Sequence, residues 1–567
     1  MTAFPWLSQY DSDVPATLEP YPQRTLLDYF DEGARERPDA PLLLFKGRAV
    51  SYREIDRDSD TFAVALAAMG VGRGDRLAVM LPNCPQFFVA ELAAWKLGAS
   101  IAPLNPIYTE EELVGPLTTI DATVILVLTP FYERLKNIQA RTPTTRVITT
   151  SIKEYFPTLT RLAFTLLMEK KLGHRVTRRG EDVAFADLMR QYAGQKPTSA
   201  RPGPDDTAML LLSGGTTGTP KCVVAHHGGL VITGLQLQTW SKSELRSWES
   251  VLFMPLPMFH SYGACAVQSA ALIGHHPIAI IPNPRDLDDL VATLHKVRPT
   301  YFMGVPTLYT AMLARKDVQD KRIDLSSLRV CVSGAAPLME ETRRRWEAIS
   351  GVRILEAYAL SESLVAATAT PMRAPARLGS VGVPLPDVQL KIVDIDDPTK
   401  LMATGETGEI LMRAPQLMRS YWRNASETAV MLQTNAAGET WMHTGDLGYL
   451  DADSYLYIVD RKKDLIKPSG LQVWPRELEE AIAKHPSVAE VGVRGFPDEA
   501  RGEIAVAFVV LREGMDVTAD DLRAFCRQHL APYKVPGRVV FRRELPKSLV
   551  GKVLRRMLTL DEPNAAS

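Results

Sequence analysis

Length, composition and charge place this chain among globular proteins and exclude several function classes. The chain has 567 residues, of which 46% are hydrophobic and 23% charged. It can therefore build more than one hydrophobic core, and its composition is not that of a disordered, collagen-like or coiled-coil protein. Its 65 Lys and Arg residues nearly balance 66 Asp and Glu residues, so no net field attracts a polyanion and we expect no nucleic-acid partner.

The cysteines and the apolar segments of the chain indicate in which cellular compartment the protein is expected. The five cysteines are odd in number, far apart and without a C-x-x-C pair, a pattern that argues against a disulfide framework or a zinc site and favours a reducing compartment. The N-terminus has no basic segment followed by an apolar one, and no stretch reaches the roughly 18–20 apolar residues of a spanning helix. We therefore expect a cytoplasmic protein.

The N-terminal half alternates helical and extended patterns. Residues 61–70 have a helical pattern and are followed by an apolar extended run at 76–82. Further buried strands are predicted at residues 123–128, 207–213, 250–256 and 328–334, each followed by turn residues. Such alternation predicts a layered α/β domain, with functional groups in the loops at strand ends.

The pattern changes in the C-terminal third. From about Asp387, short extended segments are separated by Gly and Asp turns, which predicts a β-rich subdomain. Beyond residue 460, helical patterns at 475–485 and 520–530 flank an extended one at 503–511. We therefore predict a large multi-layer α/β domain with a β-rich subdomain at residues 1–460, and a small α+β domain at residues 461–567.

One segment, residues 155–179, couples a short apolar run to a cluster of basic residues. A helix that packs an apolar face on the protein is the more ordinary interpretation, because basic outer faces are common on surface helices. An interfacial helix on a membrane is the alternative. The sequence leaves open a peripheral membrane contact through this segment, and also a homodimer.

The loop after the predicted strand at 207–213 concentrates groups that bind phosphate. Glycines let backbone N–H groups approach an anion, hydroxyls add donors, and a Lys adds a positive charge. A Walker loop is excluded by the order of residues around the Lys, which follows Pro220 and precedes Cys222. The loop predicts a polyphosphate site, with a plain Gly-rich turn as the alternative; its candidate residues are Ser213, Gly214, Gly215, Thr216, Thr217, Gly218 and Lys221.

With its neighbours, this loop resembles the phosphate-binding signature of the adenylate-forming superfamily of acyl-CoA synthetases, luciferases and peptide-synthetase adenylation domains. The other signatures of that family have counterparts in the same order, at residues 255–260, 333–338, 356–363, 443–448, 459–479 and 544–556. The resemblance extends from about Trp6 to Arg556 and is greatest to bacterial long-chain fatty-acyl-CoA ligases. It implies ATP, Mg²⁺ and CoA as partners of a small carboxylic acid, and a small domain that is mobile.

The resemblance also implies roles for single residues. Gly334, Ala335, Ala336 and Tyr358 would enclose adenine, which suits an aromatic face, and Ser361 would meet the phosphates. Glu362 would hold Mg²⁺, because a carboxylate beside a triphosphate needs a cation between them. The ribose would contact Asp446, which can accept from both hydroxyls, and Arg461. By the same resemblance, His260 would lie between the acid and the reacting phosphate, and Lys463 would be the hinge. Lys467 and Gln472 would serve the adenylate and thioester steps, and Lys552 would act in adenylation.

This chain departs from the family pattern at three positions. Cys222 replaces the Gly that usually follows the loop Lys, and Ala359 replaces the Gly after the adenine-stacking aromatic. Trp474 stands where a smaller aromatic is common. None of the three removes a charged catalytic group, but Ala359 adds a methyl where the acyl pocket would run.

The resulting prediction is an acid–thiol ligase that activates a carboxylic acid, a medium- or long-chain fatty acid, as acyl-AMP and transfers the acyl group to CoA. The predicted pocket segments 258–274 and 301–308 are mostly apolar, which favours an apolar acid over an amino acid. Alternatives are a carrier-protein phosphopantetheine as acceptor, an aryl or other acid, a luciferase-type monooxygenase, and a catalytically inactive binding homologue.

Overall fold

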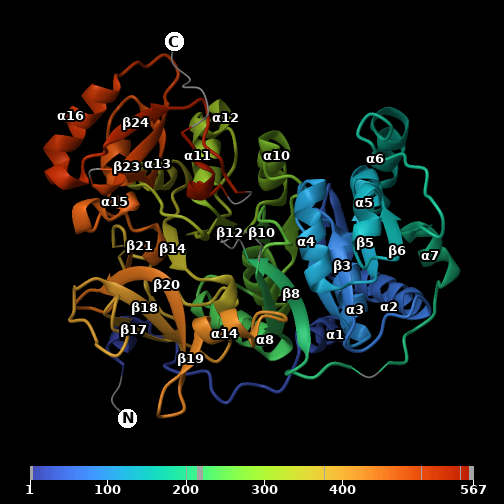
Figure 1. Ribbon diagram of the computed structural model, residues 1–567. Helices are drawn as coiled ribbons and strands as arrows, with labels where there is room; N and C mark the ends of the chain where they lie inside the picture. The colour runs from blue at the N-terminus through green and yellow to red at the C-terminus, as the bar shows by residue number, and fades with distance from the viewer. Residues whose placement is uncertain are drawn as a thin grey trace.

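A seven-stranded sheet organises the first part of the chain (Figure 1). The computed structural model describes residues 4–199, 201–213, 221–375, 377–499, 501–548 and 551–560. Most neighbouring strands of this sheet are parallel, and only the edge pair β8–β9 is antiparallel. In spatial order its strands are β7 (Val183–Ala184), β6 (Arg146–Thr150), β5 (Val124–Leu128), β3 (Arg76–Met80), β4 (Ser100–Pro103), β8 (Thr207–Ser213) and β9 (Lys221–His226).

A nine-stranded sheet lies beside it and contains strands from distant parts of the sequence. Strands β1 and β2 come from the N-terminal region, yet β1 pairs in parallel with β11. In spatial order the strands are β16 (Val383–Pro384), β15 (Thr368–Ala369), β14 (Ile354–Tyr358), β13 (Val330–Ser333), β12 (Tyr301–Gly304), β10 (Leu252–Met254), β11 (Ile278–Ile280), β1 (Pro41–Phe45) and β2 (Arg48–Ser51).

Strand β5 shows why helices cover both faces of the seven-stranded sheet. All of its residues are buried. Because side chains alternate along a strand, Val124 and Leu126 join the main core, whereas Ile125 and Val127 join a second core. Helices α4 (Glu110–Ile120) and α5 (Tyr132–Ile138) supply that second core. The main core is shared by helices that include α1 (Leu26–Glu36), α2 (Tyr52–Ala68), α3 (Pro85–Lys96), α8 (His227–Trp240), α9 (Ser269–Gly274), α10 (Leu287–Val297), α11 (Pro306–Ala314) and α13 (Glu340–Ser350).

A third, antiparallel sheet forms the β-rich subdomain, drawn in orange in Figure 1. Helix α14 (Ala425–Met431) lies beside it. The Gly and Asp turns of the sequence separate its short strands, as expected for hairpin connections. Its strands are β17 (Gln389–Val393), β18 (Gly408–Arg413), β19 (Leu432–Thr434), β20 (Thr440–Leu450) and β21 (Leu456–Arg461).

The C-terminal part, drawn in red in Figure 1, has hydrophobic clusters of its own. A three-stranded sheet is built from β22 (Val488–Asp498), β23 (Gly502–Leu511) and β24 (Arg538–Phe541). It packs with helices α15 (Pro475–Ala483) and α16 (Ala519–His529). Capping is local: Thr518 and Asp521 form a capping box at the start of α16.

The predicted fold class is confirmed, and individual elements differ mainly in their ends. The strand predicted at 207–213 has the bounds of β8, whereas those at 250–256 and 328–334 are shortened to β10 and β13. The helix predicted at 61–70 is the second half of the longer α2. The five cysteines are free and buried. In the described part of the chain, no helix is long and apolar enough to cross a membrane.

Candidate active site

A cavity of roughly 1140 Å³ lies where the nine-stranded sheet, the β-rich subdomain and the C-terminal part meet. Gly214, Gly215, Thr216, Thr217 and Gly218 lie outside the described residues, so their predicted phosphate contacts stay predictions. Ala336, Lys467 and Gln472 do not line the cavity. The other predicted site residues all line it: Ser213, Lys221, His260, Gly334, Ala335, Tyr358, Ser361, Glu362, Asp446, Arg461, Lys463 and Lys552.

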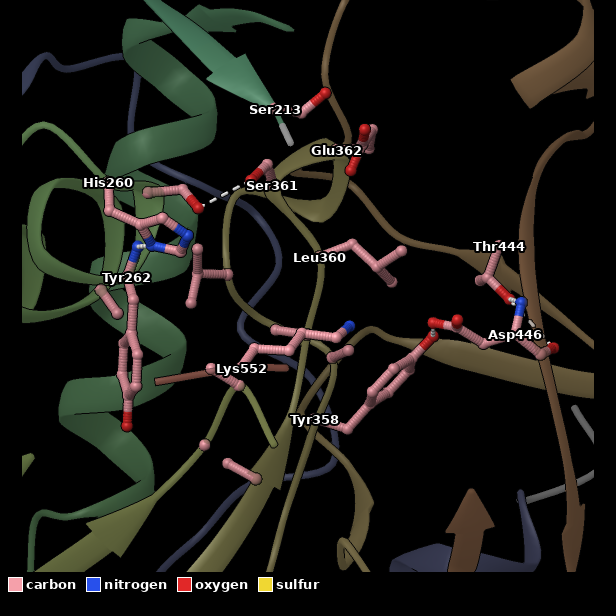
Figure 2. Close-up of a pocket in the computed structure, with 18 of the residues that line it drawn as sticks. Ser213, His260, Tyr262, Tyr358, Leu360, Ser361, Glu362, Thr444, Asp446 and Lys552 are labelled. Carbon is pink, nitrogen blue, oxygen red and sulfur yellow. Dashed lines mark hydrogen bonds between the residues drawn. The ribbon is translucent and has the colours of Figure 1, made fainter. Parts of the chain in front are cut away.

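One wall of the cavity is organised by the buried carboxylate of Asp446 on β20 (Figure 2). Tyr358, at the end of β14, donates its hydroxyl to Asp446 Oδ2 at 2.7 Å. Arg461 Nε, at the end of β21, lies 3.1 Å from Asp446 Oδ1. Burial and the nearby Asp446 charge raise the pKa of Tyr358, so its hydroxyl remains a donor at neutral pH. The two bonds hold an aromatic face and a guanidinium beside one acceptor-only group.

A second wall presents hydroxyl and carboxylate groups. Ser361 Oγ and Ser261 Oγ lie 2.8 Å apart. The mostly buried Glu362 accepts a hydrogen bond at Oε1 from the Tyr421 hydroxyl at 2.8 Å, and it forms no ion pair with any described residue. A carboxylate that lines a cavity and is not neutralised by an ion pair is a fitting oxygen ligand for a hard divalent cation such as Mg²⁺.

Lys221, at the start of β9, is oriented by contacts with the β-rich subdomain. Its ammonium forms an ion pair with Glu427 of α14 and lies 5.0 Å from the centroid of the Tyr421 ring. Both partners also line the cavity. The positive charge predicted for phosphate binding is therefore present at the cavity and has a carboxylate beside it.

His260 lies at the end of the cavity nearest the helical element η6 (Tyr262–Gln268), as Figure 2 shows. Its Nδ1 accepts a hydrogen bond from the backbone N–H of Tyr262 at 3.2 Å. Burial lowers the pKa of His260 to about 4. The imidazole is thus neutral at physiological pH and can act as a hydrogen-bonding group without adding charge.

Apolar side chains line a part of the cavity that we call its apolar arm, among them Leu237 and Trp240 of α8 and Met303 of β12. The indole N–H of Trp240 donates to the backbone oxygen of Thr370 at 3.1 Å, which fixes the ring in this wall. Ala359 lines the same cavity. This arm of the site offers an apolar environment.

Lys552 reaches the cavity from the C-terminal part of the chain. Figure 2 shows its side chain between His260 on one side and Tyr358 with Asp446 on the other. Its backbone N–H donates to Ser548 Oγ at 3.2 Å, and Ser548 N–H donates to the Lys552 carbonyl at 2.8 Å. The side chain keeps accessible surface because it lines the cavity, but surrounding protein atoms, followed by repulsion from Arg461, lower the pKa of Lys552 to about 8.

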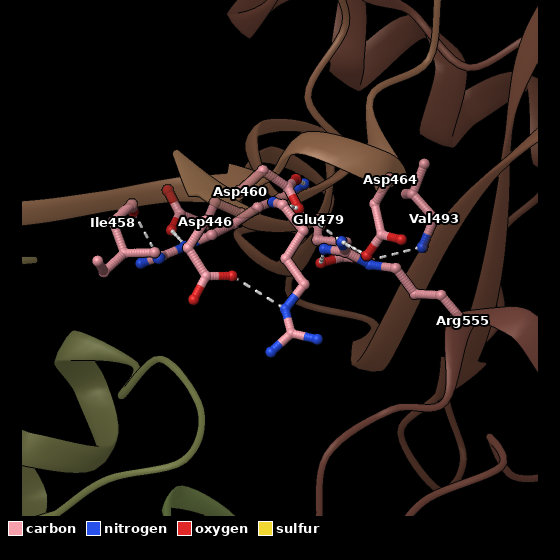
Figure 3. A network of polar contacts seen from close by, with 10 residues as sticks. Asp446, Ile458, Asp460, Asp464, Glu479, Val493 and Arg555 are labelled. Atoms are coloured by element: carbon pink, nitrogen blue, oxygen red, sulfur yellow. Dashed lines mark hydrogen bonds and ion pairs between the residues drawn. The ribbon is translucent and has the colours of Figure 1, made fainter. Parts of the chain in front are cut away.

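A network of ion pairs around Arg555 holds this C-terminal segment in place (Figure 3). The Arg555 guanidinium lies 2.7 Å from Asp460 Oδ1, 3.2 Å from Asp464 Oδ2 and 2.7 Å from Glu479 Oε2. Asp460 belongs to β21, whereas Glu479 belongs to α15. Lys463, predicted as the hinge, lies between the two aspartates in sequence. Burial and the nearby Arg461 lower the pKa of Lys463.

The remaining predicted positions lie outside the cavity. Lys467 and Gln472 are exposed, and Lys467 N–H donates to Glu503 Oε2 at 2.8 Å. Cys222 points into the core that contains Leu210 and Val224, and burial raises the pKa of its thiol to about 12. The unusual residue after the loop Lys is therefore a packing residue. Trp474 is the N-cap of α15 and does not line the cavity.

Several polar residues that line the cavity were not among the predicted site residues, and three of them contact predicted residues or their sequence neighbours. Tyr421 and Glu427 contact Glu362 and Lys221 respectively. The buried Glu409 of β18 accepts from Lys462 Nζ at 2.9 Å and lies 3.7 Å from His443 Nδ1. The Asn424 side chain that caps α14 marks the start of the helix carrying Glu427, but nothing in the local pattern indicates which group that helix meets.

Comparisons with known proteins identify a family that this chain resembles over nearly its whole length. A model of the AMP-binding enzyme family matches residues 30–422, and a model of the AMP-binding enzyme C-terminal domain matches residues 477–552. The chain is 35% identical to a long-chain-fatty-acid–CoA ligase of Bacillus subtilis over 98% of each chain. It is 33% identical to the protein of that name from Salmonella typhimurium, over 98% of this chain and 97% of that protein.

Solved structures have the same architecture. ATP-bound MatB from Rhodopseudomonas palustris aligns with a TM-score of 0.78 at 28% identity, over 93% of this chain and 97% of that chain. The anthranilate CoA ligase AuaEII, in complex with anthranoyl-AMP, aligns with a TM-score of 0.81 at 25% identity, over 96% and 97% of the two chains. The family model covers more than half of the sequence and the relatives nearly all of it, so the chain belongs to the AMP-binding, adenylate-forming enzyme family.

Proposed function

We propose that this protein joins a fatty acid to CoA at the expense of ATP, in two reactions at the one cavity. The acid carboxylate attacks the α-phosphate of ATP and pyrophosphate leaves; the CoA thiol then attacks the acyl-adenylate and AMP leaves. The observation that carries the proposal is the position of Lys552, which brings an ammonium from the C-terminal part to a cavity that joins polar nucleotide-binding groups to an apolar arm. The full-length relatives named long-chain-fatty-acid–CoA ligase support the acid and the acceptor.

In the first reaction the side chains chiefly position and neutralise. We assign the adenine to Tyr358 with Gly334, Ala335 and Ala336, and the ribose to Asp446 and Arg461. We assign the phosphates to Ser361, Lys221 and the Gly-rich loop that precedes Lys221. The Lys552 ammonium donates to the oxygens on which negative charge grows in the transition state. His260, which is neutral, separates the acyl arm from these charges.

Glu362 fits a magnesium ion, because its mostly buried carboxylate lines the cavity and forms no ion pair with a described residue. A bound Mg²⁺ supplies charge neutralisation of the phosphates. The Tyr421 hydroxyl orients the carboxylate by holding Oε1.

The second reaction requires another arrangement of the two domains, which we place at residues 1–460 and 461–567 with Lys463 as the hinge. Rotation about Lys463 would withdraw Lys552 and bring Lys467 and Gln472, both exposed here, toward the adenylate. Such alternation is a known way for one site to serve two steps. A cytoplasmic location and a homodimer stay predictions from the sequence.

A pyrophosphate-release screen tests the proposed activity. The panel contains fatty acids of graded length, aryl acids and amino acids, each with CoA or with a phosphopantetheine-loaded carrier protein. We expect release with medium- or long-chain fatty acids and an acyl-CoA product. Acylation of the carrier protein but not of CoA would show that the acceptor is a carrier protein. A preference for aryl acids would show that the substrate is not a fatty acid. Oxygen uptake with light output would indicate a monooxygenase. No release with any acid would favour an inactive binding homologue.

The pKa of Lys552 predicts how adenylation depends on pH. The ammonium is the form that donates to the phosphate oxygens, and its pKa is about 8 instead of the ordinary 10.5. We therefore expect kcat/KM for acid-dependent ATP–pyrophosphate exchange to fall as pH rises above about 8, because kcat/KM reports groups of the free enzyme. Below that pH Lys552 stays charged, so its titration does not lower kcat/KM.

Lys552→Arg is the control for this profile, since a guanidinium stays protonated at these pH values. The decline above pH 8 should be absent in that variant, whatever its absolute rate. An identical decline in both proteins would show that another group titrates.

A further inference from the structure

The helical segment formed by α6 (Thr158–Ala163) and η5 (Phe164–Met168) exposes apolar side chains. The exposed fractions are 82% for Leu159, 58% for Leu162, 74% for Leu166 and 73% for Leu167. Figure 1 shows α6 at the outer edge of the large domain, on the far side from the C-terminal domain. The favoured interpretation of this segment, a surface helix whose apolar face packs on the protein, is therefore wrong about its orientation.

The orientation is set by contacts on the protein-facing side. The Phe164 ring packs edge-on against Phe156, with centroids 5.5 Å apart, and against His174 at 5.2 Å. Lys153 Nζ donates to Thr165 Oγ1 at 3.1 Å and pairs with Glu169 Oε1 at 2.7 Å. Phe164, Thr165 and Glu169 thus face the protein, and the leucines face outward. This is the reverse of an ordinary surface helix.

Exposed basic residues lie close in sequence to the exposed leucines. Arg161, Lys170, Lys171 and Arg175 are exposed, and none forms an ion pair with a residue that the structure describes. Glu169 is the one acidic residue between positions 158 and 175, and it is turned inward onto Lys153. The exposed side chains of the segment are therefore mainly leucines and basic residues, and none of positions 158–175 adds an exposed acidic side chain.

We propose that the α6–η5 segment is a docking surface for anionic lipid membranes. Leucines of an interfacial helix insert at the boundary between headgroups and acyl chains, and Arg and Lys side chains beside them attract the lipid phosphates. A second copy of the chain is a poorer occupant, because two such faces would bring like charges together. The inference goes beyond acid activation and holds for any acid that the cavity takes.

Vesicle flotation of the full-length protein tests the proposal. Vesicles of phosphatidylcholine with phosphatidylglycerol are compared with pure phosphatidylcholine vesicles, at about 0.1 M salt so that electrostatic attraction is not fully screened. We expect binding to the anionic vesicles. The Leu159→Gln/Leu166→Gln/Leu167→Gln variant should bind at least about tenfold more weakly, since each buried leucine contributes apolar area. Lys170→Glu/Lys171→Glu should weaken binding to anionic vesicles by at least about 25-fold.

Matched substitutions elsewhere separate the segment from general surface effects. Leu378 and Leu401 are exposed leucines of the large domain, and Lys242 and Lys316 are exposed lysines. Leu378→Gln/Leu401→Gln and Lys242→Glu/Lys316→Glu should bind vesicles like the unchanged protein. All variants should retain ATP–pyrophosphate exchange with a water-soluble acid, which shows that they fold.

Three outcomes would overturn the proposal. The unchanged protein could fail to bind anionic vesicles, or the segment variants could bind as well as the matched ones. A lower mass of the leucine variant in lipid-free sedimentation would instead show that the face covers another copy of the chain. Flotation needs no catalysis, so these outcomes are distinct from a failure of the proposed ligase activity, which would appear in the pyrophosphate screen.

Discussion

Replacing Lys552 by Ala is expected to lower acid-dependent ATP–pyrophosphate exchange by about 10²–10³-fold, the usual effect of removing a donor to a developing negative charge. The ammonium lies in the cavity beside Tyr358 and Asp446. Thioester formation from supplied acyl-adenylate should change little, because Lys552 is withdrawn in the arrangement that we propose for that step. Both half-reactions are measured on the same preparation.

Lys547 provides the matched control, since it comes from the same segment but pairs with Glu490 at 2.5 Å. We expect Lys547→Ala to change exchange by less than about fivefold, as for a partly exposed ion pair. Equal loss of both half-reactions in Lys552→Ala would contradict the assignment of Lys552 to adenylation.

A methyl group at Gly551 is expected to prevent Lys552 from reaching the cavity. Gly551 has φ +74°, and a Cβ built on it would overlap Thr307 Oγ1 of α11. The left-handed backbone alone costs a non-Gly residue about 1–2 kcal/mol, and the overlap with Thr307 adds to this cost. We therefore expect Gly551→Ala to lower exchange by about 10- to 100-fold and to spare thioester formation from supplied adenylate.

A second substitution separates the overlap from the backbone strain. Thr307→Gly removes the three atoms that lie nearest to the new methyl. The Gly551→Ala/Thr307→Gly protein should therefore recover most of the exchange activity that the overlap removes. Thr307→Gly by itself should retain exchange. No recovery in the double variant would mean that the approach of residues 551 and 307 is not what positions Lys552.

Local sequence patterns determined the layered α/β class and most elements. Buried parallel strands have continuous apolar runs, so β8 could be predicted to its last residue. The chemistry-bearing residues could also be named, because Gly, hydroxyl and Lys residues at strand ends suit a phosphate wherever the strand lies. The resemblance to a family supplied their order and roles, and the family is confirmed.

Only the tertiary structure decided which of these residues meet. Tyr358 and Asp446 are 88 residues apart in sequence yet share a hydrogen bond, and Glu427 reaches Lys221 from a helix of another subdomain. An apolar run beside clustered basic residues indicated an amphipathic helix at 155–179, but composition alone does not say which face the protein covers. That choice depends on the contacts of Glu169 with Lys153 and of Phe164 with Phe156, two partners that lie ahead of α6 in the chain. The same limit applies to Lys552, because its position depends on how two separate cores are packed together and not on the residues beside it.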